Sequence, residues 1–225
     1  MKQGQVIVRA PHFVDDAFIS AFLDEKSVWL KSKIASQQQV KIKGFDFSQN
    51  SELFLFGKKV KLNISYGSKN RVLSEVDFHE SKQTSLTVII SERNRKLITN
   101  PTGLTKQIKK QLELYFRNLA QDIILPRVAE LSKQVLLRPK EIKIRQYSAR
   151  WGSCNSRDEL SFNYLLVMTP LWVIDYVIIH ELCHLKHLNH STDFWQLVAK
   201  QCPNYPEAKQ WLTRHQGELI WQLPN

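Results

Sequence analysis

One segment restricts the possible folds of this chain more than any other: an apolar run that contains two histidines four residues apart. The motif is His180-Glu181-Leu182-Cys183-His184, within WVIDYVIIHELCHLKHLNH. Apolar residues recur at spacings of three and four from Leu171 to Leu185, and Pro170 stands at the expected first turn, which predicts a helix with one face in a core. Residues four apart lie on one helix face, about 6 Å apart along the axis. Both imidazoles can therefore reach one metal ion.

The polar residues of this motif suit hydrolysis at a zinc ion. Zn²⁺ is bound tetrahedrally by imidazole nitrogens, and it lowers the pKa of a bound water to about 7. Glu181 is predicted to face that water and to act as the general base. The pattern is typical of zincins and predicts one Zn²⁺ per chain, with His180 and His184 as ligands. The alternative is an ordinary amphipathic helix that carries two solvated or hydrogen-bonded histidines.

A catalytic zinc also needs a third protein ligand and an open position. His187 is excluded because, on a continuing helix, it stands about 10 Å further along the axis than the first histidine of the motif. His190 is the favoured third ligand. We expect Asn189 to take the left-handed conformation that ends a helix, so that the chain turns back toward the metal. A carboxylate from the next helix is the alternative, Glu207 first and Glu218 second.

Four segments of the chain resemble the bacterial YgjP-like zinc metallohydrolases. They are RWGSC (150–154), LSFNYLLVMTP (160–170), VIDYVIIHELCHLKHLNH (173–190) and DFW (193–195). The resemblance is close over residues 142–195 and looser upstream. It implies that His180, His184 and His190 bind zinc and that Glu181 is the catalytic base. It also implies peptidase activity, and a nucleotide-hydrolysing activity, UTP to UMP, has been attached to the family as well.

Basic residues are concentrated in the first 140 residues of the chain. The formal net charge is +11, whereas residues 141–225 hold equal numbers of basic and acidic residues. A segment from Arg93 to Lys110 has six basic residues and no acidic one, and Lys58, Lys59 and Lys61 form a second cluster. Such a field attracts polyanions, so weak polyanion binding by the N-terminal half is one prediction. A solvated basic face is the favoured alternative, because no nucleic-acid motif is found.

Segment lengths and cysteine usage bear on the compartment of the protein. The longest apolar stretch, 165–179, is interrupted by Thr169, Pro170 and Asp175 and falls short of the roughly 20 residues that span a bilayer. The N-terminal MKQGQVIVRA lacks the features of a signal peptide. Three cysteines are an odd number without disulfide-like spacing, which suits a reducing compartment. We expect a cytoplasmic protein without a membrane partner. The oligomeric state cannot be predicted.

Periodicity divides the chain into a β-rich N-terminal region, residues 1–102, and a zincin-like metallohydrolase domain, residues 103–225. In the first region, an amphipathic helix capped by Asp15 or Asp16 is expected to run as far as Ile34. Strands are expected in QVIVRA (5–10), in ELFLFGKKVKLNISYG (52–67, two runs about a Gly-Lys turn) and in TSLTVIIS (84–91).

The second region is predicted to combine helices with a small sheet, which makes the fold class α+β. A helix is expected from Leu104, and Pro126 either starts a second helix or kinks the first. KEIKIRQYS (140–148) and ELSFNYLLV (159–167) are predicted to be strands joined by the loop RWGSCNSRD (150–158). One edge strand beside the motif helix can then hold an extended peptide by main-chain hydrogen bonds.

The loop between these strands is predicted to bring Arg150 and Trp151 to the edge of the site. Arg150 is suited to stabilise an oxyanion or to clamp a phosphate, and pairing with a surface carboxylate is the equal alternative. Four further side chains are candidate oxyanion donors, and the sequence does not choose among them: Tyr164, Tyr176, Tyr205 and His215.

Three other polar residues near the motif admit both a chemical and a structural role. Cys183 lies about 100° round the helix from the second histidine, so we expect it to pack beside the site. Cys154 is able to approach an open zinc position, but an ordinary loop thiol is favoured. Asp193 can orient a ligand imidazole or cap the following helix, for which Ser191 and Thr192 are better caps. We favour the structural role.

Together these features predict a zinc-dependent hydrolase, and most directly a metallopeptidase that uses a zinc-bound water activated by Glu181. A peptide is therefore the leading substrate. Zinc-dependent hydrolysis of a nucleoside triphosphate such as UTP is the enzymatic alternative, which the basic half and Arg150 would suit. In a non-catalytic alternative, the zinc is structural with Cys154 as fourth ligand, and the basic half is a polyanion-binding module.

Overall fold

A computed structural model describes most of the 225-residue chain. The described residues are 8, 10–39, 45–75, 85–98, 100–148, 150–219 and 221. The chain divides into two compact units, residues 1–43 and residues 44–225. This division does not fall at the boundary predicted between residues 102 and 103, which stays a prediction about domains.

The N-terminal unit contains two helices, α1 (Asp16–Glu25) and α2 (Ser27–Gln39). The predicted cap is present, because the Asp15 carboxylate accepts a hydrogen bond from the Ala17 N–H at 3.2 Å. The single helix predicted in this region is wrong, since the chain leaves helical geometry at Lys26 and starts again at Ser27. The strand predicted over residues 5–10 lies largely outside the described residues.

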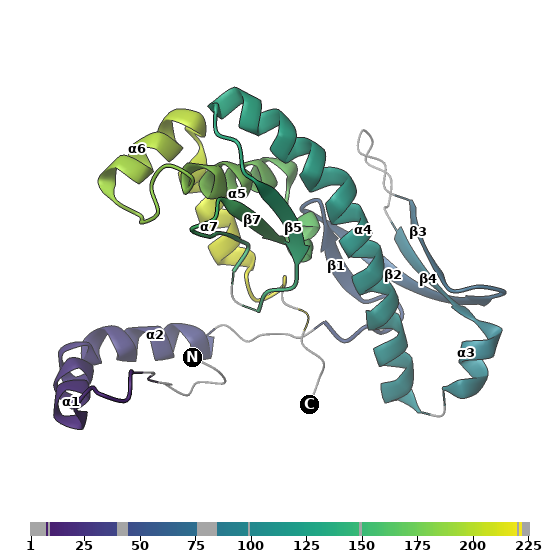
Figure 1. Cartoon of the computed structure of the whole chain (residues 1–225). Helices are drawn as coiled ribbons and strands as arrows, with labels where there is room; N and C mark the ends of the chain where they lie inside the picture. Colours follow the sequence, from purple (N-terminus) through teal and green to yellow (C-terminus); the bar gives the residue numbers. More distant parts are fainter. Residues whose placement is uncertain are drawn as a thin grey trace. The chain divides into compact units, whose positions relative to one another are not determined.

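The larger unit begins with a four-stranded sheet in the order β1-β2-β4-β3 (Figure 1). Its strands are β1 (Glu52–Leu55), β2 (Lys58–Gly67), β3 (Arg71–Glu75) and β4 (Ser85–Ser91). β1 and β2 form the predicted antiparallel hairpin, β2 and β4 pair in parallel, and β3 is antiparallel to β4. β3 was not predicted, because most of its residues are exposed and the segment has no apolar alternation.

The β1–β2 turn also supports the segment that leads into the motif helix. Phe56 and Gly57 form this turn with φ angles of 48° and 76°, and their N–H groups donate to the carbonyls of Val167 and Met168 at 2.8 and 3.0 Å. A Cβ at Gly57 would lie 2.4 Å from Cγ of Pro170. Glycine is required there both by the left-handed backbone and by this close approach.

Two helices follow, α3 (Glu92–Leu97) and the 35-residue α4 (Pro101–Val135). Helix α4 starts with the Asn100 side chain accepting from the Gly103 N–H at 2.7 Å, and it ends at Leu136 in the left-handed conformation. Pro126 lies inside α4, so the prediction of a second helix is wrong. The proline is exposed, so its missing hydrogen bond lies on the solvent side. Buried apolar residues continue on both sides of it.

The C-terminal part builds a second, three-stranded sheet and three helices. The strands are β5 (Glu141–Arg145), β6 (Gly152–Cys154) and β7 (Glu159–Asn163), in the order β5-β7-β6. β5 and β7 are parallel, and β6 is antiparallel to β7. A 3₁₀ helix, η1 (Tyr164–Met168), then precedes α5 (Leu171–Cys183), α6 (Thr192–Gln201) and α7 (Tyr205–His215).

Two predictions for this sheet need correction. The segment predicted as a strand through Val167 is a strand only as far as Asn163. There the Asn163 side chain accepts from the Leu165 N–H at 3.2 Å, and the chain turns into η1. In addition, the predicted loop between the strands contains β6, which is too short to show alternation in the sequence.

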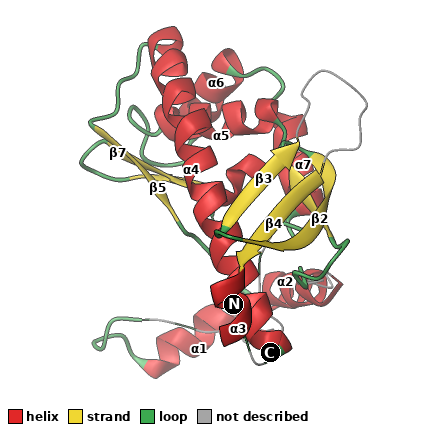
Figure 2. Ribbon diagram, turned by 90° about the vertical axis from the view of Figure 1, so that its right-hand side faces the viewer, coloured by secondary structure: helices red, strands yellow, loops and turns green. Residues whose placement is uncertain are grey.

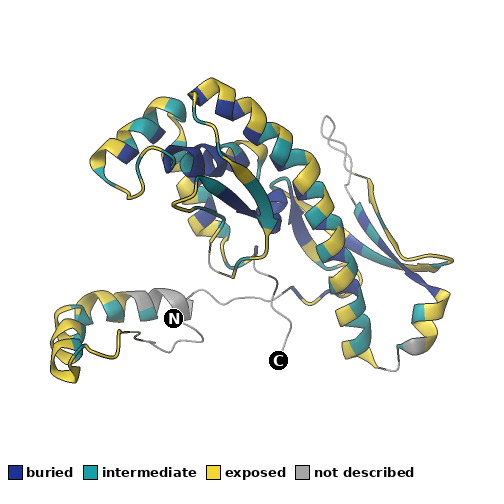
Figure 3. Cartoon of the chain, in the orientation of Figure 1, coloured by how far each residue is buried: buried dark blue, intermediate teal, exposed yellow. Residues whose placement is uncertain are grey.

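Helix α4 connects the two sheets of the larger unit, since it contacts β3 and β4 on one side and β5, η1 and α5 on the other (Figures 1 and 2). Burial is densest in β7, η1 and α5, as the dark blue ribbon in Figure 3 shows. The guanidinium of Arg127 on α4 holds Asp175 of α5 by two hydrogen bonds of 2.6 and 2.8 Å. The predicted α+β fold class is confirmed.

In the part of the chain that the structure describes, no helix has both the length and the apolar character that crossing a membrane requires.

Candidate metal centre

Helix α5 presents the buried Glu181 and the partly buried His180. It begins after Pro170 and ends at Cys183, and the turn that follows is closed by hydrogen bonds from the N–H groups of Leu185, Lys186 and His187. The predicted turn at Asn189 is wrong. Asn189 does not have a positive φ, and the last helical residue is Cys183, with His184 as the C-cap. The chain nevertheless returns, through this earlier turn, and brings His190 back to the helix.

Three histidines meet at the end of α5. His180, His184 and His190 each offer one ring nitrogen, and these nitrogens all lie within 4.8 Å of one another. The Nε2 atoms of His180 and His190 are 3.0 Å apart, and the three ring centroids are separated by 4.7 to 5.0 Å. Three imidazoles converging on one point are the donor set expected for a zinc ion.

A main-chain carbonyl orients one of these rings. Nδ1 of His184 lies 2.9 Å from the carbonyl oxygen of His187. Because a carbonyl only accepts, Nδ1 must carry the proton in the neutral ring, which leaves the lone pair of Nε2 for a metal. The sequence excluded the His187 side chain as a ligand, but it gave no signal that its carbonyl would have this role.

Aromatic residues of α6 enclose the histidines. The ring of Phe194 lies 4.4 to 5.0 Å from all three imidazoles, and Trp195 stacks on His190 at 5.6 Å. Helix α6 starts at Ser191, whose hydroxyl accepts from the Phe194 N–H at 3.3 Å, as predicted for this cap. The contact with the histidines was not predicted, since the sequence indicated only general packing of α6 over α5.

Burial favours the neutral form of His180 and of His184. It lowers the pKa of His180 from 6.5 to about 3, with further lowering by the charges of His184, His190 and Lys209. Burial also lowers the pKa of His184. Nδ1 of His180 is buried and has no hydrogen-bond partner among the described residues. Neutral imidazoles are the form that binds a metal. The residues present therefore fit a zinc ion.

Glu181 lies beside this cluster and is only 6% exposed. Burial raises the pKa of its carboxyl from 4.5 to about 8, and the charge of Arg150 lowers it in part. Gly152 of β6 leaves room for the side chain, because a Cβ there would lie 2.6 Å from Cγ and 2.7 Å from Oε1 of Glu181. A carboxyl with a raised pKa beside a cluster of metal-binding side chains is typical of a catalytic acid or base.

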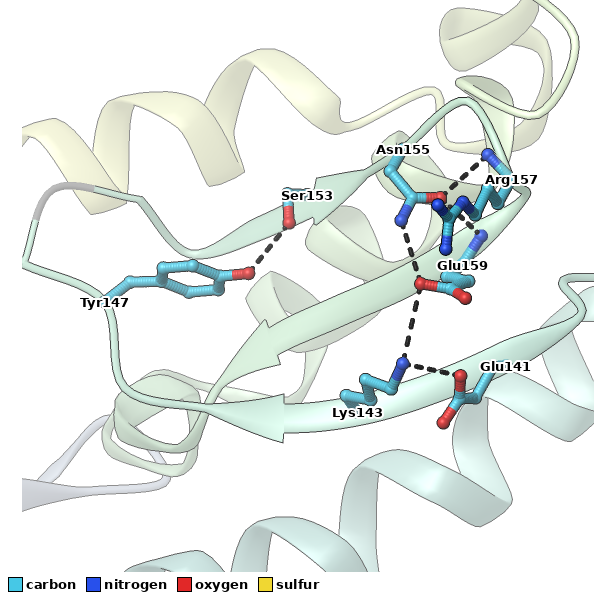
Figure 4. A network of polar contacts seen from close by, with 7 residues as sticks. All are labelled: Glu141, Lys143, Tyr147, Ser153, Asn155, Arg157 and Glu159. Atoms are coloured by element: carbon cyan, nitrogen blue, oxygen red, sulfur yellow. Dashed lines mark hydrogen bonds and ion pairs between the residues drawn. The ribbon is translucent and has the colours of Figure 1, made fainter.

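The β6 segment is held in place by polar contacts on both sides (Figure 4). Tyr147 and Ser153 share a hydrogen bond of 2.9 Å between their hydroxyl groups. The Asn155 side chain accepts from the N–H groups of Arg157 and Glu159 at 2.9 and 3.1 Å and thereby fixes the turn after β6. These contacts position the strand that approaches Glu181.

Asn163 fixes the start of the same segment from the neighbouring strand. Its side-chain Nδ2 donates to the carbonyls of Tyr147 and Arg150 at 3.1 and 3.2 Å. Its main-chain N–H donates to the Trp151 carbonyl at 2.8 Å. Asn163 is 3% exposed. Sequence reasoning missed this residue, because an asparagine inside an apparent strand carries no signal of a long-range contact.

Two of the candidate substrate contacts, Arg150 and Tyr176, act on Glu181 or His180, whereas the Tyr164 hydroxyl is directed to another helix. Arg150 is exposed, lies 5.3 Å from the centre of the Tyr147 ring, and acts on Glu181 through its charge. Trp151 is half-buried against the core, and Tyr176 lies with its ring edge-on to His180 at 5.8 Å. The Tyr164 hydroxyl, in contrast, donates to Glu113 of α4 at 3.4 Å.

The two remaining donor candidates differ in their neighbours. Tyr205 stacks on Trp195 at 5.3 Å, and Trp195 in turn stacks on His190, so one ring separates Tyr205 from the histidine cluster. His215 stacks on Trp211 at 4.2 Å, and its Nδ1 lies 2.9 Å from the Trp211 carbonyl.

The rival ligands lie apart from the histidine cluster. Among the described residues, the group of mutually close donor atoms contains the three histidines and no carboxylate or cysteine. Glu207 lines a surface hollow on α7, and Glu218 lies 3.7 Å from Nζ of Lys59. Burial raises the pKa of Cys154 to about 11, with the charge of Glu181 adding to it, so this thiol stays protonated near pH 7. Cys183 is fully buried, as expected for packing.

Three converging imidazoles with a buried carboxyl beside them define the kind of centre found in metal-dependent hydrolases. Comparison with known proteins agrees with this class. The chain matches the family model described as YgjP-like, metallopeptidase domain, over residues 1–215, and it belongs to this family. The resemblance inferred from the sequence is thus confirmed, and the family implies a divalent metal, for which zinc is the usual choice.

Two solved structures are similar to part of the chain. The metallopeptidase zymogen abylysin of Pyrococcus abyssi is 19% identical, with a TM-score of 0.38, over 43% of this chain and 99% of that one. The metallopeptidase zymogen jannalysin of Methanocaldococcus jannaschii is 22% identical, with a TM-score of 0.34, over 40% of this chain and 96% of that one. None of the curated proteins matches the chain.

Proposed function

We propose that this protein is a zinc-dependent metallopeptidase with His180, His184 and His190 as zinc ligands and Glu181 as the catalytic base. The observation that carries the proposal is the convergence of three imidazole nitrogens within 4.8 Å of one another. Glu181 follows the first of them on α5, and its side chain is buried. Zinc, when bound, would supply a Lewis acid for a peptide carbonyl.

Glu181 would move the proton in this reaction. In its ionised form the carboxylate removes a proton from the attacking water, and it then donates that proton to the leaving amine. Gly152 leaves the carboxylate space on the β6 side, and the burial of Glu181 excludes bulk water from it. We propose Tyr176 and Arg150 as donors to the developing oxyanion. The Tyr176 ring packs edge-on against His180, and the charge of Arg150 acts on Glu181.

Strand β6 offers a place for an extended peptide. It lies at the edge of its sheet and pairs, among the described strands, with β7 alone. An edge strand binds a peptide through its unpaired main-chain N–H and carbonyl groups. Since Gly152 of β6 touches Glu181, a peptide on this edge would pass beside the carboxylate.

The test is product release from a mixed peptide library by wild-type protein and by Glu181→Gln, with and without a zinc chelator. The proposal predicts cleavage by the wild type that the chelator abolishes and zinc restores. It predicts a loss of about a hundredfold or more in Glu181→Gln, in line with the loss of a general base. Peptides that stay intact under all these conditions would contradict the proposal.

Nucleoside triphosphates belong in the same experiment. Cleavage of UTP that depends on zinc and on Glu181, without any peptide cleavage, would assign the site to nucleotide hydrolysis. Zinc binding without either activity would favour a structural zinc. The absence of a fourth ligand in the described cluster of donor atoms supports the enzymatic proposal over a structural one, because structural zinc sites are closed by four protein ligands.

A further inference from the structure

A continuous aromatic stack leads away from the histidine cluster toward helix α7. Trp195 stacks on His190 with 24° between the ring planes, and Tyr205 stacks on the Trp195 ring at 5.3 Å. Nζ of Lys209 lies over the ring of Trp195, 4.9 Å from its centroid. One aromatic residue therefore touches a proposed zinc ligand, a tyrosine and a cation at the same time.

Tyr205, at the far end of this stack, lines an open surface hollow of about 710 Å³ along α7. Tyr205 and Lys209 both line the hollow, together with Glu207 and Arg214 of the same helix. Among the described residues, neither Lys209 nor Arg214 takes part in an ion pair. The hollow thus carries two cations against the single carboxylate of Glu207, and its charge suits an anionic group.

We propose that Lys209 and Arg214, with Trp195 and Tyr205, form a specificity subsite that selects peptides with a carboxylate near the scissile bond. The proposal rests on the metallopeptidase function proposed above. In this subsite the exposed atoms of the half-buried Trp195 and Tyr205 rings contact the aliphatic part of the substrate, and Lys209 pairs with its carboxylate. The cation over Trp195 is held by the ring, so it is oriented before the substrate binds.

The separations limit where in the substrate this carboxylate can lie. Nζ of Lys209 lies 4.9 Å from the centroid of the Trp195 ring, and that centroid lies 5.6 Å from the centroid of the His190 ring. The distance from Nζ to the His190 ring cannot exceed the sum of these two separations. An extended peptide advances about 3.3 to 3.6 Å per residue. The carboxylate must therefore belong to one of the roughly three residues next to the cleaved bond, either as an Asp or Glu side chain or as a free C-terminus.

The first test compares cleavage of matched peptides by the wild type. One pool contains Glu at each position near the bond and is amidated at its C-terminus, the second has Gln in its place, and the third has Gln with a free C-terminal carboxylate. We expect the wild type to prefer the Glu pool or the free-acid pool by about fivefold at low salt, as for an exposed ion pair. The favoured pool identifies the source of the carboxylate.

Variants of two lysines decide whether the preference comes from this subsite. Lys209→Gln should abolish it, and Lys209→Glu should reverse it, so that the amidated Gln pool is cleaved faster than the pool with the carboxylate. Lys200→Gln is the matched control, because Lys200 is also an exposed lysine and lies on the neighbouring helix α6. It should keep the wild-type preference. Equal cleavage of all three pools by the wild type would overturn the subsite while leaving the metallopeptidase function intact.

A binding measurement separates the two proposals if no peptide is cleaved. Fluorescence anisotropy of the same labelled peptides with Glu181→Gln protein reports Kd without turnover. A preference for carboxylate peptides of about fivefold that Lys209→Gln removes and Lys200→Gln keeps would support the subsite even if the metallopeptidase function failed. Equal Kd values for the Glu and Gln peptides, or a preference that Lys209→Gln leaves unchanged, would overturn it.

Discussion

Gly152 and Glu181 are in such close contact that no larger residue fits at position 152 without movement of the glutamate. A Cβ on Gly152 would lie 2.6 Å from Cγ, 2.7 Å from Oε1 and 2.9 Å from Cδ of Glu181. Such distances are far below an ordinary van der Waals contact. The edge strand β6 therefore sets the position of the proposed catalytic base.

The variant Gly152→Ala should displace this proposed base and leave the three histidines in place. We expect a loss of tenfold or more in kcat/KM, with zinc affinity near that of the wild type, and destabilisation of about 1 to 3 kcal/mol from overpacking. Gly103→Ala is the control, because its Cβ would meet the Asn100 Oδ1 at 3.3 Å and Cγ2 of Ile98 at 3.8 Å, both near the start of α4 and neither as close as the contacts at Gly152. If Gly152→Ala cleaved peptides as fast as the wild type, β6 would not position Glu181.

The pair Arg127 and Asp175 should stabilise the packing of α4 against α5. The two hydrogen bonds are 2.6 and 2.8 Å long, and both side chains are partly buried. A double-mutant cycle with Arg127→Met and Asp175→Asn should give a coupling energy of about 1 to 2 kcal/mol, measured by urea denaturation. The exposed pair Lys140 and Asp158, 2.9 Å apart, is the comparison and should give about 0.5 kcal/mol or less. Equal coupling in the two pairs would contradict this account.

The stability of the metal-free protein should depend on pH through Glu181. The pKa of Glu181 is raised from 4.5 to about 8, so the folded chain keeps a proton that the unfolded chain releases between these values. This contribution is fully present below pH 4.5 and is lost as the pH rises through 8. His180 has the opposite effect, because its pKa is lowered from 6.5 to about 3. Its contribution is complete above pH 6.5 and is lost as the pH falls.

The two contributions can be separated between pH 6.5 and 8. In this range Glu181 keeps a proton in the folded chain that it has lost in the unfolded chain, whereas His180 is mostly neutral in both. Between these pH values the chelator-treated wild type should lose about 2 kcal/mol relative to Glu181→Gln, measured by urea denaturation of both proteins. A parallel pH dependence of the two proteins would show that Glu181 has an ordinary pKa in the fold.

Polyanion binding by the basic N-terminal half stays a prediction and has its own test. Lys106, Lys109 and Lys110 lie in the first turns of α4. Charge reversal of these three lysines should weaken the binding of a single-stranded oligonucleotide in fluorescence anisotropy. The affinity of the wild type should fall by a factor of 10 or more between about 50 and 200 mM salt, since counterions are released on binding. An affinity that does not change with salt would exclude this mode of binding.

Local patterns in the sequence predicted the histidines that converge in the structure but not the contacts that support them. The helix around His180 and the cap at Ser191 follow from periodicity and from capping chemistry, which act over a few residues. The approach of Gly152 to Glu181 depends on the pairing of β6 with β7, which no local pattern reports. The carbonyl of His187 belongs to the main chain and has no side-chain signature at all.

The route to His190 shows the same limit. The sequence predicted that the chain turns back and brings His190 toward the metal. The ligand role stays a prediction, and Nε2 of His190 lies 3.0 Å from Nε2 of His180. The predicted means of return, a left-handed turn at Asn189, is wrong. The helix ends earlier, where tight main-chain hydrogen bonds close the turn at Leu185 and Lys186. These hydrogen bonds join residues three apart instead of four and satisfy the last carbonyls of the helix. No residue type in the turn signals them.

The most direct test of the metal centre is a competitive zinc titration of chelator-treated protein against a chromophoric chelator. We expect one zinc ion per wild-type chain, and an affinity at least about a hundredfold lower for His180→Ala, for His184→Ala and for His190→Ala. Glu207→Ala is the control and should bind zinc as the wild type does. No zinc bound to the wild type, or an unchanged affinity in His190→Ala, would contradict a centre built from these three histidines.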